Sequence, residues 1–215
     1  MTDTAPAGCV CVIDDDVEIR GSIGSLVRSS GFDVGLYETT KAFLAAGVPA
    51  RPSCLVLDVR LPDDNGLDFQ ERLATQGIDI PVILITGHGD IPMTVRGMKA
   101  GAIDFLPKPF TDDQLLAAVA AAIDADRLRR TEVADKLGLQ KLHQQLTPRE
   151  REVMGFVVTG LLNKQIAARM EISEITVKIH RGNVMRKMEA QSLADLVRMA
   201  EVLDVRDRSI HRFST

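Results

Sequence analysis

Five short apolar runs, separated by segments with helical periodicity, dominate the first 124 residues of the chain. The runs are CVCVI (9–13), FDVGLY (32–37), SCLVLD (53–58), PVILIT (81–86) and AIDFLP (102–107). Between them, apolar residues recur every three or four positions, which is the pattern of an amphipathic helix. Strands that alternate with helices form a parallel sheet, and uniformly apolar strands are typical of a sheet covered on both faces. We therefore expect an α/β domain over residues 1–124.

Polar residues stand where four of these five strands would end. They are Asp14, Asp15 and Asp16 after the first run, Asp58 at the end of the third, Thr86 at the end of the fourth and Lys108 after the fifth. The carboxyl ends of parallel strands meet at one edge of a sheet, where such folds bind their ligands. Packed carboxylates repel one another unless a cation lies among them, and carboxylate oxygens suit Mg²⁺. The sequence therefore predicts a divalent-cation site at this edge.

The charge of the chain is unevenly distributed. Residues 1–126 carry 9 Lys and Arg against 19 Asp and Glu, a balance of -10, whereas residues 127–215 carry 17 against 11, a balance of +6. An acidic half joined to a basic half indicates two domains, of which the second faces a polyanion. Aromatic residues make up only 4% of the chain, which argues against base-stacking platforms.

The boundary between the two halves has its own pattern. Residues 125–145 are rich in charge and glutamine and predict a helical linker, broken or frayed near Gly138. In LTPRERE, which follows, Thr147 is placed as an N-cap, Pro148 at the first helical position and Glu150 at the third. This arrangement is a capping box and predicts a sharp helix start.

The basic half predicts a DNA-binding unit. NKQIAARMEISEITVKIHRGNVMRKM reads as a short helix, a turn near residues 171–173 and a second helix, and a further helix begins near Ser192. Together with the capped helix, these segments indicate an all-α, four-helix helix-turn-helix domain over residues 146–215.

The helix over residues 174–188 has two distinct faces. Turned at 100° per residue, it places Val177, Val184 and Met188 toward a core, with His180 at the edge. The opposite face carries Ile175, Lys178, Ile179, Gly182 and Arg186. In a major groove, Ile179 would meet a thymine methyl group and Lys178 the acceptors of guanine. The alternative is that the two isoleucines are ordinary exposed residues.

Several residue types argue against other sites and compartments. Cys9, Cys11 and Cys54 lie in apolar runs and are expected to be reduced core residues of a cytoplasmic protein. His88 has no second His or Cys nearby, so it is interpreted as a loop histidine. The start MTDTAPAG does not resemble a signal peptide, and the longest apolar run, 115–123, is too short to span a bilayer.

The segments VIDDD, LVLDVRLPDDNG, LITGHGD and DFLPKPF resemble the receiver domain of bacterial two-component response regulators, especially those of the FixJ type, over residues 9–124. The resemblance implies a flavodoxin-like sheet of strand order 2-1-3-4-5. It implies that Asp58 accepts phosphate from a sensor histidine kinase. Mg²⁺ (or Mn²⁺) would be held by Asp14, Asp15, Asp58 and the backbone carbonyl of Arg60. Thr86 and Lys108 would contact the phosphoryl group, Phe105 would occupy the aromatic switch position, and the Lys108–Pro109 peptide would be cis.

The segments LTPRE, NKQIA and TVKIHRGNVMRKM resemble the LuxR-type helix-turn-helix domain over residues 145–204. The resemblance implies contacts to DNA phosphates from Lys164, Thr176, Arg181 and Lys187. Gly182 stands where relatives often carry a longer, base-contacting side chain. The two resemblances together cover about four-fifths of the chain, which is therefore similar to response regulators of the FixJ/NarL type, which are not enzymes. Such a protein would bind promoter DNA, act with RNA polymerase and form a homodimer when phosphorylated, with no membrane partner.

Parts of the sequence are also compatible with two other functions. An aspartate-nucleophile phosphohydrolase would use Asp14 and Asp16 after the first strand, but it leaves the helix-turn-helix unexplained. A DNA-binding protein whose acidic pocket is never phosphorylated is the third hypothesis. Asp16 itself, at a helix start, is better explained as an N-cap than as a ligand.

Overall fold

The computed structural model describes residues 8–87 and 90–205 and divides into two compact units, Met1–Arg130 and Thr131–Thr215. Each unit has hydrophobic clusters of its own. His88, predicted to be a loop histidine, lies outside the described residues.

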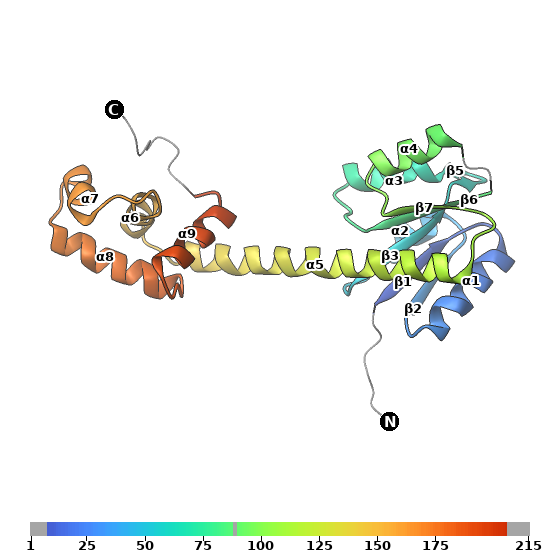
Figure 1. Cartoon of the computed structure of the whole chain (residues 1–215), viewed down its shortest axis with the longest axis horizontal. Helices are drawn as coiled ribbons and strands as arrows, with labels where there is room; N and C mark the ends of the chain where they lie inside the picture. Colours follow the sequence, from blue (N-terminus) through green and yellow to red (C-terminus); the bar gives the residue numbers. More distant parts are fainter. Residues whose placement is uncertain (1–7, 88–89, 206–215) are drawn as a thin grey trace, which may run out of the picture. The chain divides into compact units, whose positions relative to one another are not determined.

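The first unit is built on a five-stranded sheet in which all neighbouring strands are parallel (Figure 1). Its strands are β1 (Cys9–Ile13), β2 (Asp33–Tyr37), β3 (Ser53–Asp58), β6 (Val82–Thr86) and β7 (Asp104–Pro107). The spatial order β2-β1-β3-β6-β7 confirms the predicted order 2-1-3-4-5. The numbering differs because β4 (Arg60–Leu61) and β5 (Asp64–Asn65) form a separate antiparallel pair after β3.

Helices cover both faces of this sheet, as the apolar strands predict. They are α1 (Val17–Ser29), α2 (Thr40–Ala46), α3 (Gly66–Thr75), α4 (Ile91–Lys99) and α5 (Asp112–Gln144). Because side chains alternate along a strand, Cys9 and Cys11 of β1 pack in one cluster with residues of α2 and α3. Val10 and Val12 pack on the other face with residues of α1 and α5. All three cysteines are buried and unpaired, as predicted.

The linker differs from its prediction. α5 runs from Asp112 to Gln144 without the break expected near Gly138. A glycine inside a helix is unfavourable by only about 1 kcal/mol relative to alanine. The early part of α5 packs on the sheet through residues such as Val119, and Leu142 near its end packs in the core of the second unit. The cost of Gly138 alone is therefore too small to break the helix.

Up to residue 205, the last that the structure describes, the second unit contains four helices after α5, as predicted. They are α6 (Pro148–Val158), α7 (Asn163–Met170), α8 (Glu174–Lys187) and α9 (Leu193–Val202). The capping box at the start of α6 is present, with Thr147 and Glu150 bonded to each other's backbone amides. α7 ends at Met170, and its C-cap residue Glu171 adopts a left-handed conformation that turns the chain into α8. Across the described ranges, no helix has the length and apolarity needed to cross a membrane.

Candidate functional site

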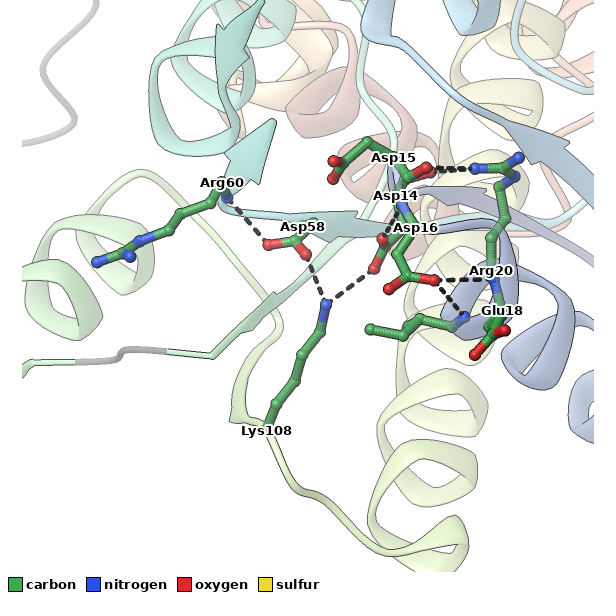
Figure 2. A network of polar contacts seen from close by, with 9 residues as sticks. Asp14, Asp15, Asp16, Glu18, Arg20, Asp58, Arg60 and Lys108 are labelled. Atoms are coloured by element: carbon green, nitrogen blue, oxygen red, sulfur yellow. Dashed lines mark hydrogen bonds and ion pairs between the residues drawn. The ribbon is translucent and has the colours of Figure 1, made fainter. Parts of the chain in front are cut away.

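Three strand ends bring charged side chains together at one edge of the sheet. Asp14 follows β1, Asp58 ends β3 and Lys108 follows β7. The Lys108 ammonium lies 2.9 Å from Asp14 Oδ2 and 2.5 Å from Asp58 Oδ2, so it bridges the two carboxylates (Figure 2). With Asp15, these residues are called the acidic site below. Residues 94 positions apart in the sequence therefore meet where the strand pattern predicts.

The carboxylates of the acidic site form a donor set that fits a small divalent cation. Asp14, Asp15 and Asp58 each offer an oxygen, and these oxygens all lie within 4.8 Å of one another. Oxygens bound at about 2.1 Å to an octahedral Mg²⁺ are themselves about 3 to 4 Å apart. Small side-chain adjustments would therefore bring the three oxygens to coordination distance.

Burial and the neighbouring charges act in opposite directions on the pKa values of Asp14 and Lys108. Burial raises the pKa of Asp14, and the hydrogen bond from Lys108 opposes only part of that rise. For Lys108, burial acts to lower the pKa, but the hydrogen bonds to Asp58 and Asp14 outweigh it and hold the pKa above its usual value. The ammonium is therefore charged at physiological pH and is available to balance an anion at Asp58.

The backbone after β3 fixes the orientation of Asp58. Its Oδ1 accepts a hydrogen bond from the backbone amide of Arg60 at 2.9 Å, while Oδ2 faces Lys108. The Arg60 side chain points away from the site (Figure 2). Gly66, at the start of α3, is required here because a Cβ atom would overlap the carbonyl oxygen of Asp58. The sequence prediction did not include Gly66.

The remaining predicted receiver residues lie on neighbouring strands. Thr86 is buried at the end of β6, and its carbonyl accepts the backbone amide of Lys108 at 2.7 Å. Phe105 on β7 pairs with Leu84 on β6 and packs half-buried beneath α4, close to Gly97. The Lys108–Pro109 peptide is cis, as predicted. Asp16 caps α1 by accepting the amides of Glu18 and Ile19, which confirms its interpretation as an N-cap.

The second unit presents one exposed face of α8. Val177, Val184 and Met188 are buried, as the helical periodicity predicts. Ile175 and Ile179 on the other face are 74% and 59% exposed. Lys178, Gly182 and Arg186 are exposed beside them, and Lys164 is exposed on α7. An exposed face that combines isoleucine methyl groups with cations suits a major groove.

Two residues that were predicted to contact DNA phosphates form hydrogen bonds within the second unit. Arg181 donates to Asn163 Oδ1 at 2.7 Å, and Thr176 lies beside the helix cap, with its hydroxyl 2.8 Å from that of Ser173. Lys187, also predicted to contact a phosphate, forms an ion pair within the unit. Its ammonium lies 2.6 Å from a carboxylate oxygen of buried Glu150 and 3.3 Å from the carbonyl of Gln145.

Comparisons with known families agree with this geometry. Residues 10–120 match the response regulator receiver domain, and residues 144–200 match the bacterial regulatory proteins of the luxR family. The fold and site thus define a receiver domain followed by a helix-turn-helix domain. The chain belongs to the response regulators that join these two domains, and it is a phosphorylation-controlled transcriptional regulator.

The chain is similar to known response regulators over most of its length. Nodulation protein W of Bradyrhizobium diazoefficiens is 52% identical over 204 residues, covering 95% of this chain and 90% of the relative. The transcriptional regulatory protein FixJ of Rhizobium meliloti is 43% identical over 191 residues, covering 89% and 94%. The solved structure of the response regulator StyR superposes with a TM-score of 0.80 at 44% identity, covering 90% of this chain and 98% of that one.

Proposed function

We propose that Asp58 is the phosphoacceptor, and that a sensor histidine kinase is the donor. The observation that carries this proposal is the Lys108 ammonium held between Asp14 and Asp58, beside a third carboxylate. Transfer forms a bond between an Asp58 oxygen and phosphorus while the bond from phosphorus to the donor's imidazole nitrogen breaks. Attack by one anion on another needs positive charge and fixed geometry.

The residues of the acidic site supply both requirements. Arg60 NH and Lys108 fix the Asp58 carboxylate, and the Lys108 charge opposes the repulsion of the incoming phosphoryl oxygens. Asp14, Asp15, Asp58 and the Arg60 carbonyl would hold Mg²⁺ or Mn²⁺. The bound ion would supply further positive charge against the phosphoryl oxygens.

Thr86 and Phe105 are the residues through which phosphorylation would reach the rest of the receiver. The acyl phosphate adds negative charge and strong acceptor oxygens at Asp58. A turn of the Thr86 hydroxyl toward them would leave space on β6, and Phe105 on β7 would turn inward to fill it. Because Phe105 packs close to Gly97 of α4, this movement would change the surface of the receiver around α4, and homodimer formation is the expected consequence.

The second unit would bind promoter DNA through α8. Lys178 and Ile179 would contact bases, with Gly182 and Arg186 on the same exposed face. Lys164, Thr176 and Arg181 would contact phosphates. For Lys187, the ion pair with Glu150 favours a structural role instead. The protein would act in the cytoplasm, and RNA polymerase is the expected partner at the promoter.

A phosphohydrolase remains the enzyme alternative, and the structure weakens it. That mechanism needs Asp16 as a free acid beside Asp14, but the Asp16 side chain caps α1 and accepts two backbone amides. We therefore propose that the chain is not an enzyme that turns over phosphate esters.

Incubation with Mg²⁺ and acetyl phosphate, followed by intact mass measurement, tests the three hypotheses together. A regulator gains a single stable phosphoryl group, and Asp58→Asn does not. A phosphohydrolase releases free phosphate with many substrates and accumulates no adduct. A protein whose pocket is never phosphorylated does neither, and that result would contradict the proposed function.

A further inference from the structure

The turn between β1 and α1 presents two of the acidic carboxylates and lies outside both elements. β1 ends at Ile13, and the first helical bond of α1 runs from the Arg20 amide to the carbonyl of Asp16. The carbonyls of Asp14 and Asp15 precede this N-cap, so no helix amide is available to them. Another donor must satisfy them if the turn is to hold one conformation.

The side chain of Arg20 supplies that donor. Its Nη1 lies 2.6 Å from the carbonyl oxygen of Asp14 and 3.3 Å from that of Asp15. Arg20 is one turn into α1, a helix anchored on the sheet by buried Ile23 and Val27. A guanidinium has several donors in a fixed plane, so it can hold two neighbouring carbonyls from one anchored position.

Arg20 acts on main-chain atoms and leaves the carboxylates accessible. In Figure 2 its guanidinium lies on the side of Asp15 opposite to the Asp15 carboxylate. Its charge is therefore close to the turn but does not occupy the position that a metal cation would take.

The two carboxylates depend on this contact to different degrees. Asp14 is also fixed through its side chain, because Oδ1 accepts the Asp16 amide at 2.9 Å and Oδ2 faces Lys108. The Asp15 carboxylate has no hydrogen-bond partner among the described residues and is exposed. Its position relative to Asp14 and Asp58 is therefore set by its backbone, which Arg20 holds.

We propose that Arg20 is a positioning residue of the acidic site: it holds the carbonyls of Asp14 and Asp15 so that both carboxylates meet a divalent cation together. The inference rests on the proposed function, since it assigns Arg20 a part in the metal site that phosphorylation needs. It concerns the preorganisation of ligands, whose outer-shell partners commonly affect metal affinity about 10- to 100-fold.

The test measures Mn²⁺ affinity directly, by electron paramagnetic resonance of the free ion, in the unphosphorylated full-length protein. Arg20→Met should weaken Mn²⁺ binding about tenfold or more. Arg28→Met is the matched control, because Arg28 lies in the last turn of the same helix and loses the same charge. The Mn²⁺ affinity of Arg28→Met should equal that of the wild type. Circular dichroism and thermal unfolding identify any variant that has lost its fold.

Two further readouts separate positioning from other roles. In phosphorylation by acetyl phosphate, Arg20→Met should need a higher Mg²⁺ concentration for half-maximal rate yet reach the wild-type adduct at saturating Mg²⁺. Arg20→Lys keeps the charge but lacks the planar fork, so it should recover only part of the Mn²⁺ affinity.

Three results would overturn the inference. They are unchanged Mn²⁺ affinity in folded Arg20→Met, an equal loss in Arg28→Met, and full recovery in Arg20→Lys, which would show that charge alone matters. Absence of Mn²⁺ binding and of phosphorylation in the wild type would instead overturn the proposed function, and this inference with it.

Discussion

One lysine shared between two carboxylates defines the acidic site at the scale of single residues. Three carboxylates against one ammonium leave a formal charge of -2, which a divalent cation would balance. Lys108 contacts Asp14 and Asp58 but not Asp15, so the exposed end of the site is the end left open for that cation. A phosphoryl group arriving at Asp58 would compete with Asp14 for the same ammonium.

Replacing Asp58 with asparagine should abolish phosphorylation while the fold survives. An amide oxygen can still accept the Arg60 amide, but it is no nucleophile toward phosphorus, and one of the crowded negative charges is removed. Intact mass after acetyl phosphate treatment and circular dichroism check the two parts. Peptide mapping that found phosphate on Asp14 or Asp15 in the wild type would contradict the assignment.

Replacing Lys187 should affect stability more than DNA binding. Lys187→Met leaves buried Glu150 without its cationic partner, which we expect to lower the stability of the α6–α8 packing by about 1 to 3 kcal/mol. Native-state hydrogen exchange of α6 and α8 amides measures this loss locally.

Lys178→Met is the matched control for this experiment, since Lys178 is exposed on the same helix. Lys178→Met should change stability by less than about 0.5 kcal/mol. It should weaken binding to target DNA more than binding to non-target DNA. If Lys187→Met were as stable as the wild type but bound all DNA weakly, the result would support the phosphate contact predicted for Lys187 from the sequence.

At the scale of elements, α5 is attached to the receiver by a buried carboxylate. Asp126 is fully buried and accepts the backbone amide of Ser53 at 2.8 Å. It also accepts hydrogen bonds from Arg129 and Arg130. Arg129 donates in addition to Asp79, and Arg130 to the carbonyl of Pro49. Asp126 and its two arginine partners therefore tie the helix to the start of β3 and to the segments that precede β3 and β6.

Asp126→Asn should destabilise the receiver by about 1 to 3 kcal/mol at neutral pH, because buried donors lose a charged acceptor. Asp124→Asn is the control, since the exposed ion pair of Asp124 with Arg127 contributes at most about 1 kcal/mol. Thermal unfolding of the two variants and the wild type measures the difference.

The pH dependence of the Asp126 variant follows from its pKa. Burial acts to raise the pKa of Asp126, but hydrogen bonds from Arg130, Arg129 and the Ser53 amide outweigh it and lower the pKa below its usual value. A lowered pKa in the folded state stabilises the protein above the unfolded pKa of about 3.9, and this stabilisation is lost as the pH falls through the folded value. The stability gap between wild type and Asp126→Asn should therefore close below about pH 4. A gap that stayed constant to lower pH would show that the charge of Asp126 does not contribute.

At the scale of the whole molecule, the sequence predicts the elements and the strand ends but not the contacts between distant charges. Periodicity reports burial, so the five strands, both faces of α8 and the convergence of Asp14, Asp58 and Lys108 could be predicted. Pairing of Lys187 with Glu150, 37 positions away, leaves no local pattern. Arg20 bonds backbone carbonyls, which have no signature in the sequence, and Asp126 lies in a charged segment that resembles a solvated linker.

The central proposal is that phosphorylation of the acidic receiver controls DNA binding by the basic domain. DNA occupancy measures this control most directly. Purified wild type and Asp58→Asn are each incubated, with and without acetyl phosphate and Mg²⁺, with sheared genomic DNA of the encoding organism, and bound fragments are sequenced. Phosphodonor should raise occupancy at a defined set of sites for the wild type and leave Asp58→Asn unchanged. Equal occupancy of wild-type sites with and without phosphodonor, or an equal response of Asp58→Asn, would contradict the account.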